Sequence, residues 1–431
     1  MDHDVNRASS PQPHGEIEEV KKSAGQLDAA AEYLRLHQDE FVDITEEEER
    51  KVLRKIDILL MPIMLVTITL AAVDKIVISN AALYGMQTDT GLKGQLYSWT
   101  GSIFYFGYLV SEYPSNFLLQ KLPVGKFLGI SCIIWSAIVT LMAAAQNPPG
   151  IMVLRFLMGA LEAPLFPSCS IITVMWYKRS EQPIRTAIWF SGLSSLVTGI
   201  VSYGIGHTNT SIAPWRLLFI VLGGFTFLWS IFITIMLPDS PTKNRFLNER
   251  EKYIAIMRIK DNMTGTESKE FKFYQFPWLM SILLTFLAKT ELPRTNKHGL
   301  LASYYCFYSY WAPYVTVTSL PFANTSGHTK KTTVNALMFI AYCVANIIAP
   351  QFFISTEVPG YRTGYSAIMG FLSAGICMLA IYAVGLRFEN EKRDKVIAEK
   401  RAAGVDVDAE REAESLLDKT DREKTYFHYL Y

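Results

Sequence analysis

Long apolar runs separated by short polar stretches dominate the chain from residue 58 onward. The first half contains six such runs, each with the roughly 20 residues that a helix needs to cross a bilayer. They cover residues 58–78, 96–119, 127–145, 151–176, 186–206 and 217–237. Short segments of alternating apolar and polar residues, typical of membrane β-strands, are absent from this pattern. Because only helices and closed barrels satisfy every backbone group in lipid, the pattern predicts a six-helix transmembrane bundle.

The second half has fewer apolar runs. Residues 273–288 are apolar but barely long enough to cross, and the polar stretch KTELPRTNKHG follows at 289–299. Residues 300–320, 333–354 and 365–386 can each span a bilayer. We therefore predict an all-α polytopic membrane protein of about ten spans, with a complete first bundle and an incomplete second one.

Polar segments frame and divide these bundles. Residues 1–43 are rich in Glu, Lys, Ser and Pro, a composition typical of disorder. Thr45 with Glu48 matches a capping box, and predicts a short surface helix leading into the first apolar run. Asn248 with Glu251 predicts another helix start after the sixth run.

Five parts follow from this division. They are an N-terminal tail with a short amphipathic helix (1–55), a six-helix transmembrane bundle (56–238), a linker (239–272), an incomplete transmembrane bundle (273–387) and a C-terminal tail (388–431).

Basic residues mark alternate loops. In the first half they include Arg50, Lys51, Arg54, Lys55, Lys121, Lys126, Lys178, Arg179, Arg185, Lys243, Arg245, Arg250 and Lys252. Since Lys and Arg are enriched in cytoplasmic loops, these segments should face the cytoplasm. The first residues show no basic stretch followed by an apolar core, so we expect no cleaved signal peptide. Both termini and the linker are then cytoplasmic.

Composition supports a membrane protein and excludes several other classes. The chain of 431 residues is 50% hydrophobic and 19% charged, whereas soluble domains contain about a quarter charged residues. A net charge of +1 gives no indication of nucleic-acid binding. The five cysteines lie in apolar stretches without a CxxC pair, which favours buried, inert thiols over a disulfide framework or a metal site. We expect no cofactor and no bound metal.

Few charged residues fall inside the predicted spans. They are Asp74, Lys75, Glu112, Arg155 and Glu162, with Arg216 at the outer edge of the sixth span. A charge at the centre of a membrane helix costs about 2.5–3.5 kcal/mol on insertion scales, so each is a candidate functional residue. Arg216 follows Trp215 and is most simply an interfacial anchor.

The stretch RFLMGALEAPLFP carries two of these charges, Arg155 and Glu162, on one helix face. They are separated by roughly 10 Å along the helix axis, too far for an ideal ion pair, so each needs another partner. An arginine fork suits a carboxylate, and a buried carboxyl group takes up a proton more readily than one in water. The pair therefore predicts an anion site coupled to a proton site.

Structural roles are the alternative for each of these residues. Arg155 would then pair permanently with Asp74, Glu112 or Glu162 and hold the bundle together. Asp74 and Lys75 would form a structural network, and Glu112 a structural or gating contact.

Several stretches of the chain match the motifs of a known family. They are AAVDKIVISNA, SEYPSN, RFLMGALEAPLFPS, WYKRSEQPIRTA, PWRLLF, LPDSPTKNRFLNEREK, NTSGHTKKTTVNA and YCVANIIAPQFF. In this order they resemble the fungal allantoate permease-like branch of the major facilitator superfamily, which is grouped with the anion:cation symporters. The resemblance covers roughly residues 44–393.

This resemblance implies twelve helices in two six-helix bundles with the substrate between them. It also implies import of small, mostly anionic nutrients such as allantoate, ureidosuccinate, nicotinate, pantothenate or biotin precursors, typically with protons. Related anion transporters use an arginine and a glutamate at the positions of Arg155 and Glu162. The chain departs from the family at Lys75, where arginine is usual, and at 289–299, which stands where the eighth and ninth helices should be.

The resulting hypothesis is proton-coupled symport of a small organic anion by a plasma-membrane monomer. Arg155 binds the anion, Glu162 binds or relays the proton, and Asp74, Lys75 and Glu112 form a supporting network. The alternative is a non-transporting membrane sensor, or an inactive truncated paralogue. We expect no enzymatic activity, because neither a soluble catalytic domain nor an intramembrane His or Asp cluster is visible.

Overall fold

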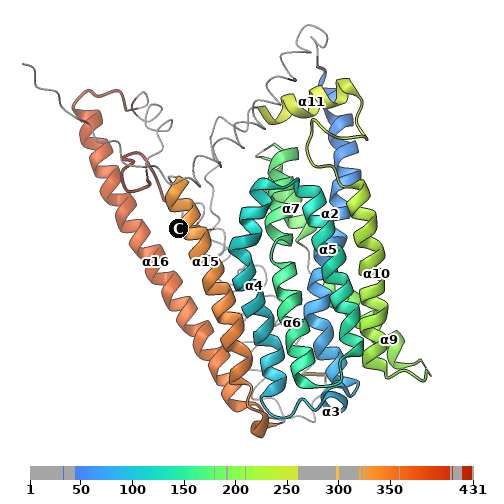
Figure 1. Ribbon diagram of the computed structural model, residues 1–431. Helices are drawn as coiled ribbons and strands as arrows, with labels where there is room; N and C mark the ends of the chain where they lie inside the picture. Colours follow the sequence, from blue (N-terminus) through green and yellow to red (C-terminus); the bar gives the residue numbers. More distant parts are fainter. Residues whose placement is uncertain are drawn as a thin grey trace, which may run out of the picture. The chain divides into compact units, whose positions relative to one another are not determined.

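The computed structural model divides the chain into two compact units, Met1–Gly265 and Thr266–Tyr431 (Figure 1). It describes residues 33, 44–178, 180–190, 193–208, 210–260, 298–299, 320–321, 324–326, 328–358, 360–407, 410 and 420–429. Within these residues the regular structure is helical throughout, without a strand. The predicted all-α fold is therefore confirmed.

The first unit is a bundle of long apolar helices (Figure 1). Its helices are α2 (Glu46–Leu83), α3 (Met86–Thr90), α4 (Leu96–Lys121), α5 (Val124–Leu141), η1 (Met142–Ala144), α6 (Pro148–Glu162), α7 (Leu165–Trp176), α8 (Gln182–Trp189), α9 (Ser194–Gly206), α10 (Pro214–Met236) and α11 (Glu249–Lys260). Helix α6 packs against α4 and α5, α10 against α5 and α2, and α8 and α9 against α2. Each of the six predicted spans of the first half lies on these helices.

The first helix begins as its sequence predicts. The Thr45 hydroxyl accepts a hydrogen bond from the Glu48 N–H, and the Glu48 carboxylate accepts one from the Thr45 N–H. This capping box opens a helix of 38 residues that continues through the first apolar run without a break. The predicted surface helix and the first span are therefore one rigid element.

Two of the predicted spans are interrupted. The fourth consists of α6 and α7, which are separated at Ala163–Pro164, and the fifth consists of α8 and α9. Proline has no backbone N–H to continue the helical ladder and clashes with the preceding turn, which accounts for the break at Pro164. Glu162 is the last residue of α6, so the break lies directly beside a membrane-embedded acid.

The basic segments predicted to share one side of the membrane meet at one end of the first unit. Ion pairs join them to acidic residues of neighbouring segments: Lys126 with Asp239, Lys178 with Glu49, Arg185 with Asp57, Arg250 with Glu48, and Arg258 with Glu49 and Glu181. These pairs connect the start of α2 with the α7–α8 loop, α8 and α11, and the start of α5 with the segment after α10. The up-and-down alternation of the first half agrees with the loop charges.

The linker helix α11 begins where its sequence predicts. The Asn248 side chain accepts a hydrogen bond from the Glu251 N–H at 2.8 Å, and the Glu251 carboxylate accepts one from the Asn248 N–H at 3.0 Å. Arg258 of α11 is only 4% exposed, and α11 packs against α2 and α7.

The second unit contains two long helices. Its elements are α15 (His328–Ile348), η5 (Ala349–Phe352), η6 (Ser355–Glu357) and α16 (Arg362–Ala402). The predicted runs 333–354 and 365–386 fall on α15 with the short helices after it and on α16. The predicted run 273–288, and the predicted run 300–320 apart from Leu320, lie outside the described residues.

The cysteines follow the sequence expectation with one correction. Cys132, Cys169 and Cys343 are buried free thiols, as predicted, whereas Cys377 is exposed. Cys377 lies on the apolar part of α16, whose most apolar stretch of 18 residues contains no buried residue. Cys306 lies outside the described residues.

Two glycines set the closest helix crossing in the first unit. A Cβ atom on Gly159 of α6 would lie 1.9 Å from the carbonyl oxygen of Phe104 on α4. One on Gly107 of α4 would lie 2.0 Å from the carbonyl oxygen of Phe156. The two backbones are therefore in direct contact, as at other membrane helix interfaces built on small residues.

We predict that Gly159→Ala lowers the thermal stability of the purified chain in detergent. The added methyl group has no space, and overpacking of this kind costs about 1–3 kcal/mol. Gly224→Ala on α10 is the matched control, because nothing lies within 4 Å of its Cβ position. Its melting temperature should equal or exceed that of the wild type, since alanine favours a helix by about 1 kcal/mol over glycine. Equal melting temperatures for Gly159→Ala and wild type would contradict the close crossing.

Candidate functional site

Four of the five predicted membrane charges lie on two helices of the first unit. Asp74 and Lys75 come from α2, and Arg155 and Glu162 from α6. Asp74 is 1% exposed, and Arg155 and Glu162 are each 2% exposed. Such burial of three ionisable side chains is rare in proteins unless they are paired or functional.

Glu162 is paired with Lys75. The Lys75 Nζ atom lies 2.6 Å from Glu162 Oε1, and only the lysine side chain retains appreciable exposure, at 31%. Two rings of α4 complete its surroundings, since Lys75 Nζ lies 5.7 Å from the centre of Phe104 and 5.8 Å from that of Tyr108. The second oxygen of Glu162 is buried and has no hydrogen-bond partner among the described residues.

Arg155 has a different environment. Its Nη1 atom donates a hydrogen bond to the backbone carbonyl oxygen of Asp74 at 3.3 Å. Its Nε and Nη2 atoms are buried and have no hydrogen-bond partner within the described part of the chain. Neither Asp74, Glu112 nor Glu162 forms an ion pair with Arg155 in that part, so the predicted permanent pair is absent there.

The unpaired edge of Arg155 is the one that binds carboxylates elsewhere in the same structure. Arg185 uses its Nε and Nη2 atoms to hold both oxygens of Asp57. Arg250 uses the same two atoms to hold both oxygens of Glu48. Arg155 therefore presents a buried two-pronged donor of the shape that a carboxylate fits.

Asp74 also has an unpaired charge-bearing group. Both of its carboxyl oxygens are buried and lack a hydrogen-bond partner among the residues that the structure describes. Only its backbone carbonyl contacts Arg155. The site thus combines one ion pair, Lys75 with Glu162, with an arginine and an aspartate whose functional groups remain available.

Glu112 is not part of this cluster. Its Oε1 atom accepts a hydrogen bond from the Asn116 amide at 3.0 Å, one turn along α4, and its Oε2 atom is buried without a partner in the described chain. The contact is local to SEYPSN and gives no direct link to Arg155 or Glu162. Glu112 therefore stays a candidate for a structural or gating contact.

Arg216 occupies an anchoring position, as its sequence context suggested. Its guanidinium donates to the Ala143 carbonyl oxygen at 2.6 Å and lies 4.5 Å from the ring of Trp215. The Trp215 indole in turn donates to Asp89 at 2.7 Å. These contacts fix the start of α10 and involve none of the four clustered charges.

The two aromatic residues beside Lys75 could not be recognised as site residues from the sequence. Phe104 and Tyr108 are one helical turn apart on α4 and both face Lys75. Their spacing of four residues was visible, but apolar aromatic residues in a predicted span carry no signal that distinguishes a site from lipid-facing or packing positions. The tight α4–α6 crossing brings them next to the charges.

The cluster has the chemistry for binding an anion and a proton. The Arg155 edge can hold a carboxylate, and Glu162 and Asp74 are carboxyl groups that can each hold a proton. Within the described residues, no group of three or more His, Cys, Asp or Glu side chains could hold a metal ion.

Comparisons with known proteins agree with this architecture. Residues 63–393 match the family model of the Major Facilitator Superfamily. An uncharacterised transporter of Schizosaccharomyces pombe is 33% identical over 496 aligned positions, covering 96% of this chain and 93% of the relative. The allantoate permease of Saccharomyces cerevisiae is 30% identical, covering 90% of this chain and 88% of the permease.

A solved structure supports the same fold. It is a bacterial homologue of the human lysosomal transporter Spinster, in an inward-facing and occupied conformation. The similarity has a TM-score of 0.50 with 13% sequence identity, covering 74% of this chain and 90% of that chain.

The alignment with the first of these relatives is longer than this chain. The alignment with the Schizosaccharomyces pombe transporter spans 496 positions, whereas 96% of this chain of 431 residues is aligned. Roughly 80 aligned positions therefore have no residue here, enough for two or three spans of about 20 residues with their loops.

The relatives are named as transporters and permeases, not enzymes, and the family match at 63–393 includes the stretches that carry the buried charges. The described part of the chain contains six helices long and apolar enough to cross a membrane. The chain therefore belongs to the Major Facilitator Superfamily and is a multi-pass integral membrane protein.

Proposed function

We propose that the chain is a secondary active transporter that moves a small organic anion together with protons. The observation that carries this proposal is the buried edge of Arg155, whose Nε and Nη2 atoms have no hydrogen-bond partner within the described residues. An uncompensated charge in a membrane bundle costs several kcal/mol. A bound carboxylate substrate would offset this cost, so we infer that Arg155 binds the substrate.

Proton coupling would use the carboxyl groups beside that arginine. Protonation of Glu162 would remove the negative charge that now holds Lys75 at 2.6 Å. The Lys75 ammonium group would then be attracted more strongly to an anionic substrate or to the Asp74 carboxyl group, whose two oxygens have no partner in the described chain. Occupancy of the proton site and of the anion site would thus depend on one another, as symport requires.

The substrate class follows from the charge and donor geometry of Arg155 and from one relative. A single arginine fork selects a planar anion such as a carboxylate over a bulky polyanion. One relative, 30% identical, is an allantoate permease, and allantoate is a small carboxylate. We therefore propose a substrate of the class of allantoate, ureidosuccinate, nicotinate or pantothenate, imported across the plasma membrane.

Transport in this proposal occurs by rocking of two helix bundles about a site near the middle of the membrane, carried out by a monomer. Both termini and α11 would face the cytoplasm, because the basic segments that converge at one end of the first unit are of the type enriched there.

A non-transporting role is the second candidate, and the roughly 80 alignment positions without a residue in this chain favour it. A second bundle that lacked two helices would leave the anion site in the first bundle intact. It would weaken the alternating closure of the site toward the two sides of the membrane, which transport requires. Such a chain would bind the anion as a sensor, or be an inactive paralogue. Accumulation of substrate separates the two functions.

We predict that Arg155→Lys lowers uptake of radiolabelled allantoate, or of another small carboxylate from a panel, by roughly tenfold to a hundredfold in proteoliposomes. Lysine keeps the charge but cannot make the two parallel hydrogen bonds, and charged hydrogen bonds contribute about 1.5–3 kcal/mol each. Arg216→Lys is the matched control and should transport like wild type, since the interactions of Arg216 with the Ala143 carbonyl and with Trp215 involve none of the four clustered charges. Equal loss in both variants would contradict the assignment, and binding without uptake in wild type would favour the sensor.

We also predict that Glu162→Gln separates exchange from accumulation. Glutamine imitates the protonated acid, so the variant should exchange labelled for unlabelled substrate across the membrane yet fail to concentrate it when the outside is acidified. Wild-type accumulation should collapse on addition of a protonophore. Accumulation by Glu162→Gln at the wild-type level would show that this carboxyl group does not couple the proton, and Asp74→Asn would then be the next variant to measure.

A further inference from the structure

Helix α16 is far longer than a membrane span requires. It runs for 41 residues, whereas about 20 cross a bilayer, and from Arg387 onward its sequence is polar and charged. Within this polar extension Asn390 is only 2% exposed and Arg393 only 8% exposed. Polar residues on a helix in water become this buried only where another segment covers them.

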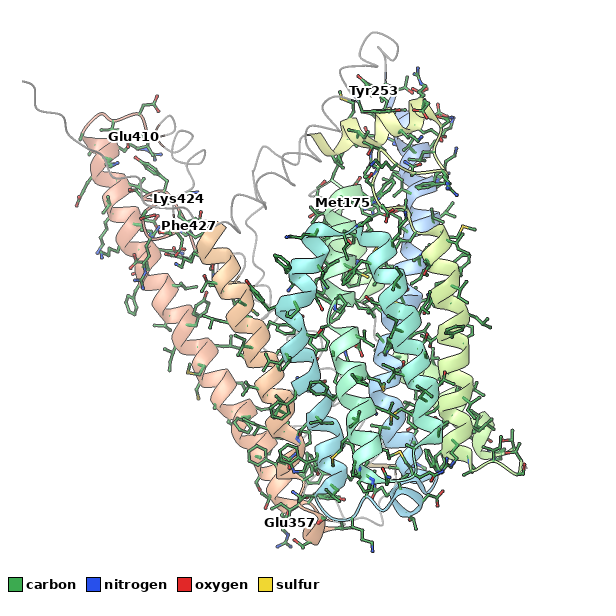
Figure 2. The ribbon with its side chains drawn as sticks, in the orientation of Figure 1. Met175, Tyr253, Glu357, Glu410, Lys424 and Phe427 are labelled. Carbon is green, nitrogen blue, oxygen red and sulfur yellow. The ribbon has the colours of Figure 1, made fainter. Side chains whose placement is uncertain are left out.

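The segment that covers them is Thr420–Tyr429, near the end of the chain. Figure 2 shows Lys424 and Phe427 lying beside α16, and Glu410 near the C-terminal end of that helix. On α16, positions 390 and 393 are buried and positions 397 and 400 are half-buried, at the three- and four-residue spacing of a single helix face. On the other side of this contact Asp421, Tyr426 and Tyr429 are buried.

Asn390 pairs with the backbone of this segment in both directions. Its amide group donates to the Tyr429 carbonyl oxygen at 2.8 Å, and its carbonyl oxygen accepts from the Tyr429 N–H at 2.9 Å. A side-chain amide that uses both of its groups in this way fixes the position of a peptide segment along the helix.

Arg393 is the anchor of the contact. Its guanidinium donates to the carbonyl oxygens of Lys424 and Phe427 at 2.8 Å and of Asp421 at 3.0 Å. It also donates to the Tyr429 hydroxyl at 3.1 Å and lies 4.7 Å from the centre of that ring. Three carbonyls gathered on one guanidinium use its fixed geometry, which a lysine ammonium group cannot reproduce.

Asp421 extends the contact to a second helix. Its carboxylate accepts hydrogen bonds from Lys330 Nζ at 2.6 Å, near the start of α15, and from the Ser326 N–H at 3.3 Å. Its other oxygen accepts from the Tyr429 hydroxyl at 2.8 Å. Although burial raises the pKa of Asp421, the hydrogen bonds from Lys330, Tyr429 and Ser326 hold it below its usual value, so the group is charged at neutral pH.

We propose that the polar extension of α16 is a docking site whose ligand is the chain's own segment Thr420–Tyr429, and that docking couples α16 to the start of α15. Arg393 holds the segment on α16, and Asp421, ordered by that docking, holds Lys330 and Ser326. The ion pair of Lys400 with Glu410 at 2.8 Å supports the same contact further along the helix. Within the described part of this unit, the segment thus contacts both long helices.

Hydrogen exchange of the full chain in lipid nanodiscs tests this proposal without requiring any transport activity. In wild type, the amides of the docked segment and of residues 324–330 should be protected. Arg393→Lys should accelerate exchange in both regions by at least roughly tenfold, although residue 393 lies more than sixty positions from α15's start. Asp421→Asn, which removes the charge but keeps the shape of the side chain, should accelerate exchange around Ser326 and Lys330. It should leave the exchange of the α16 amides unchanged. Lys395→Ala, an exposed position on the same extension, is the matched control and should leave both regions unchanged.

Two results would overturn the proposal. Unprotected amides over residues 420–429 in wild type would show that the docking site has no resident ligand. Faster exchange in that segment alone, with the start of α15 unaffected by Arg393→Lys and by Asp421→Asn, would show that docking does not couple the two helices.

Discussion

Everything distinctive about this chain depends on the cost of holding ionised groups inside an apolar helix bundle. Arg155, Glu162 and Asp74 are each at most 2% exposed, within the apolar stretches of α2 and α6. Glu162 reduces its cost by pairing with Lys75 at 2.6 Å. Among the described residues, Arg155 makes one hydrogen bond, to the backbone carbonyl of Asp74, and the carboxyl oxygens of Asp74 accept none. This difference between the paired Glu162 and the unpaired Arg155 and Asp74 groups is the physical basis for proposing that the site binds a substrate.

The backbone makes this arrangement possible. Gly107 and Gly159 bring α4 and α6 into direct contact, which places the rings of Phe104 and Tyr108 against Lys75. Pro164 ends the regular helix just after Glu162 and separates α6 from α7. The acid therefore sits at a point where the helix is interrupted, next to the ion pair that protonation would disturb.

Local signals in the sequence predicted much of the fold. The capping residues Thr45 and Asn248 mark helix starts that the structure confirms, because such motifs act through neighbouring backbone groups alone. The long apolar runs predicted the membrane helices, because lipid forces each of them to satisfy its own hydrogen bonds. The charged candidates were equally visible, since so few interrupt those runs.

Contacts between distant segments could not be predicted in this way. That Lys75 rather than Arg155 pairs with Glu162 depends on how α2 and α6 are rotated against each other, which no single segment encodes. The same holds for Arg393, which in the sequence is one of several basic residues after a span, and in the structure gathers three carbonyls of a remote segment. The break between α8 and α9 was also missed, because the run 186–206 contains no proline to mark it.

The most direct measurement of the central claim is equilibrium binding of a radiolabelled small carboxylate to the purified chain in nanodiscs, with a pH dye to follow protons. If the Arg155 edge is an anion site beside a proton site, binding is saturable, takes up protons from the medium, and disappears in Arg155→Gln while Arg216→Gln retains it. Binding that is unaffected by Arg155→Gln, or that moves no protons in any buffer, would contradict the account.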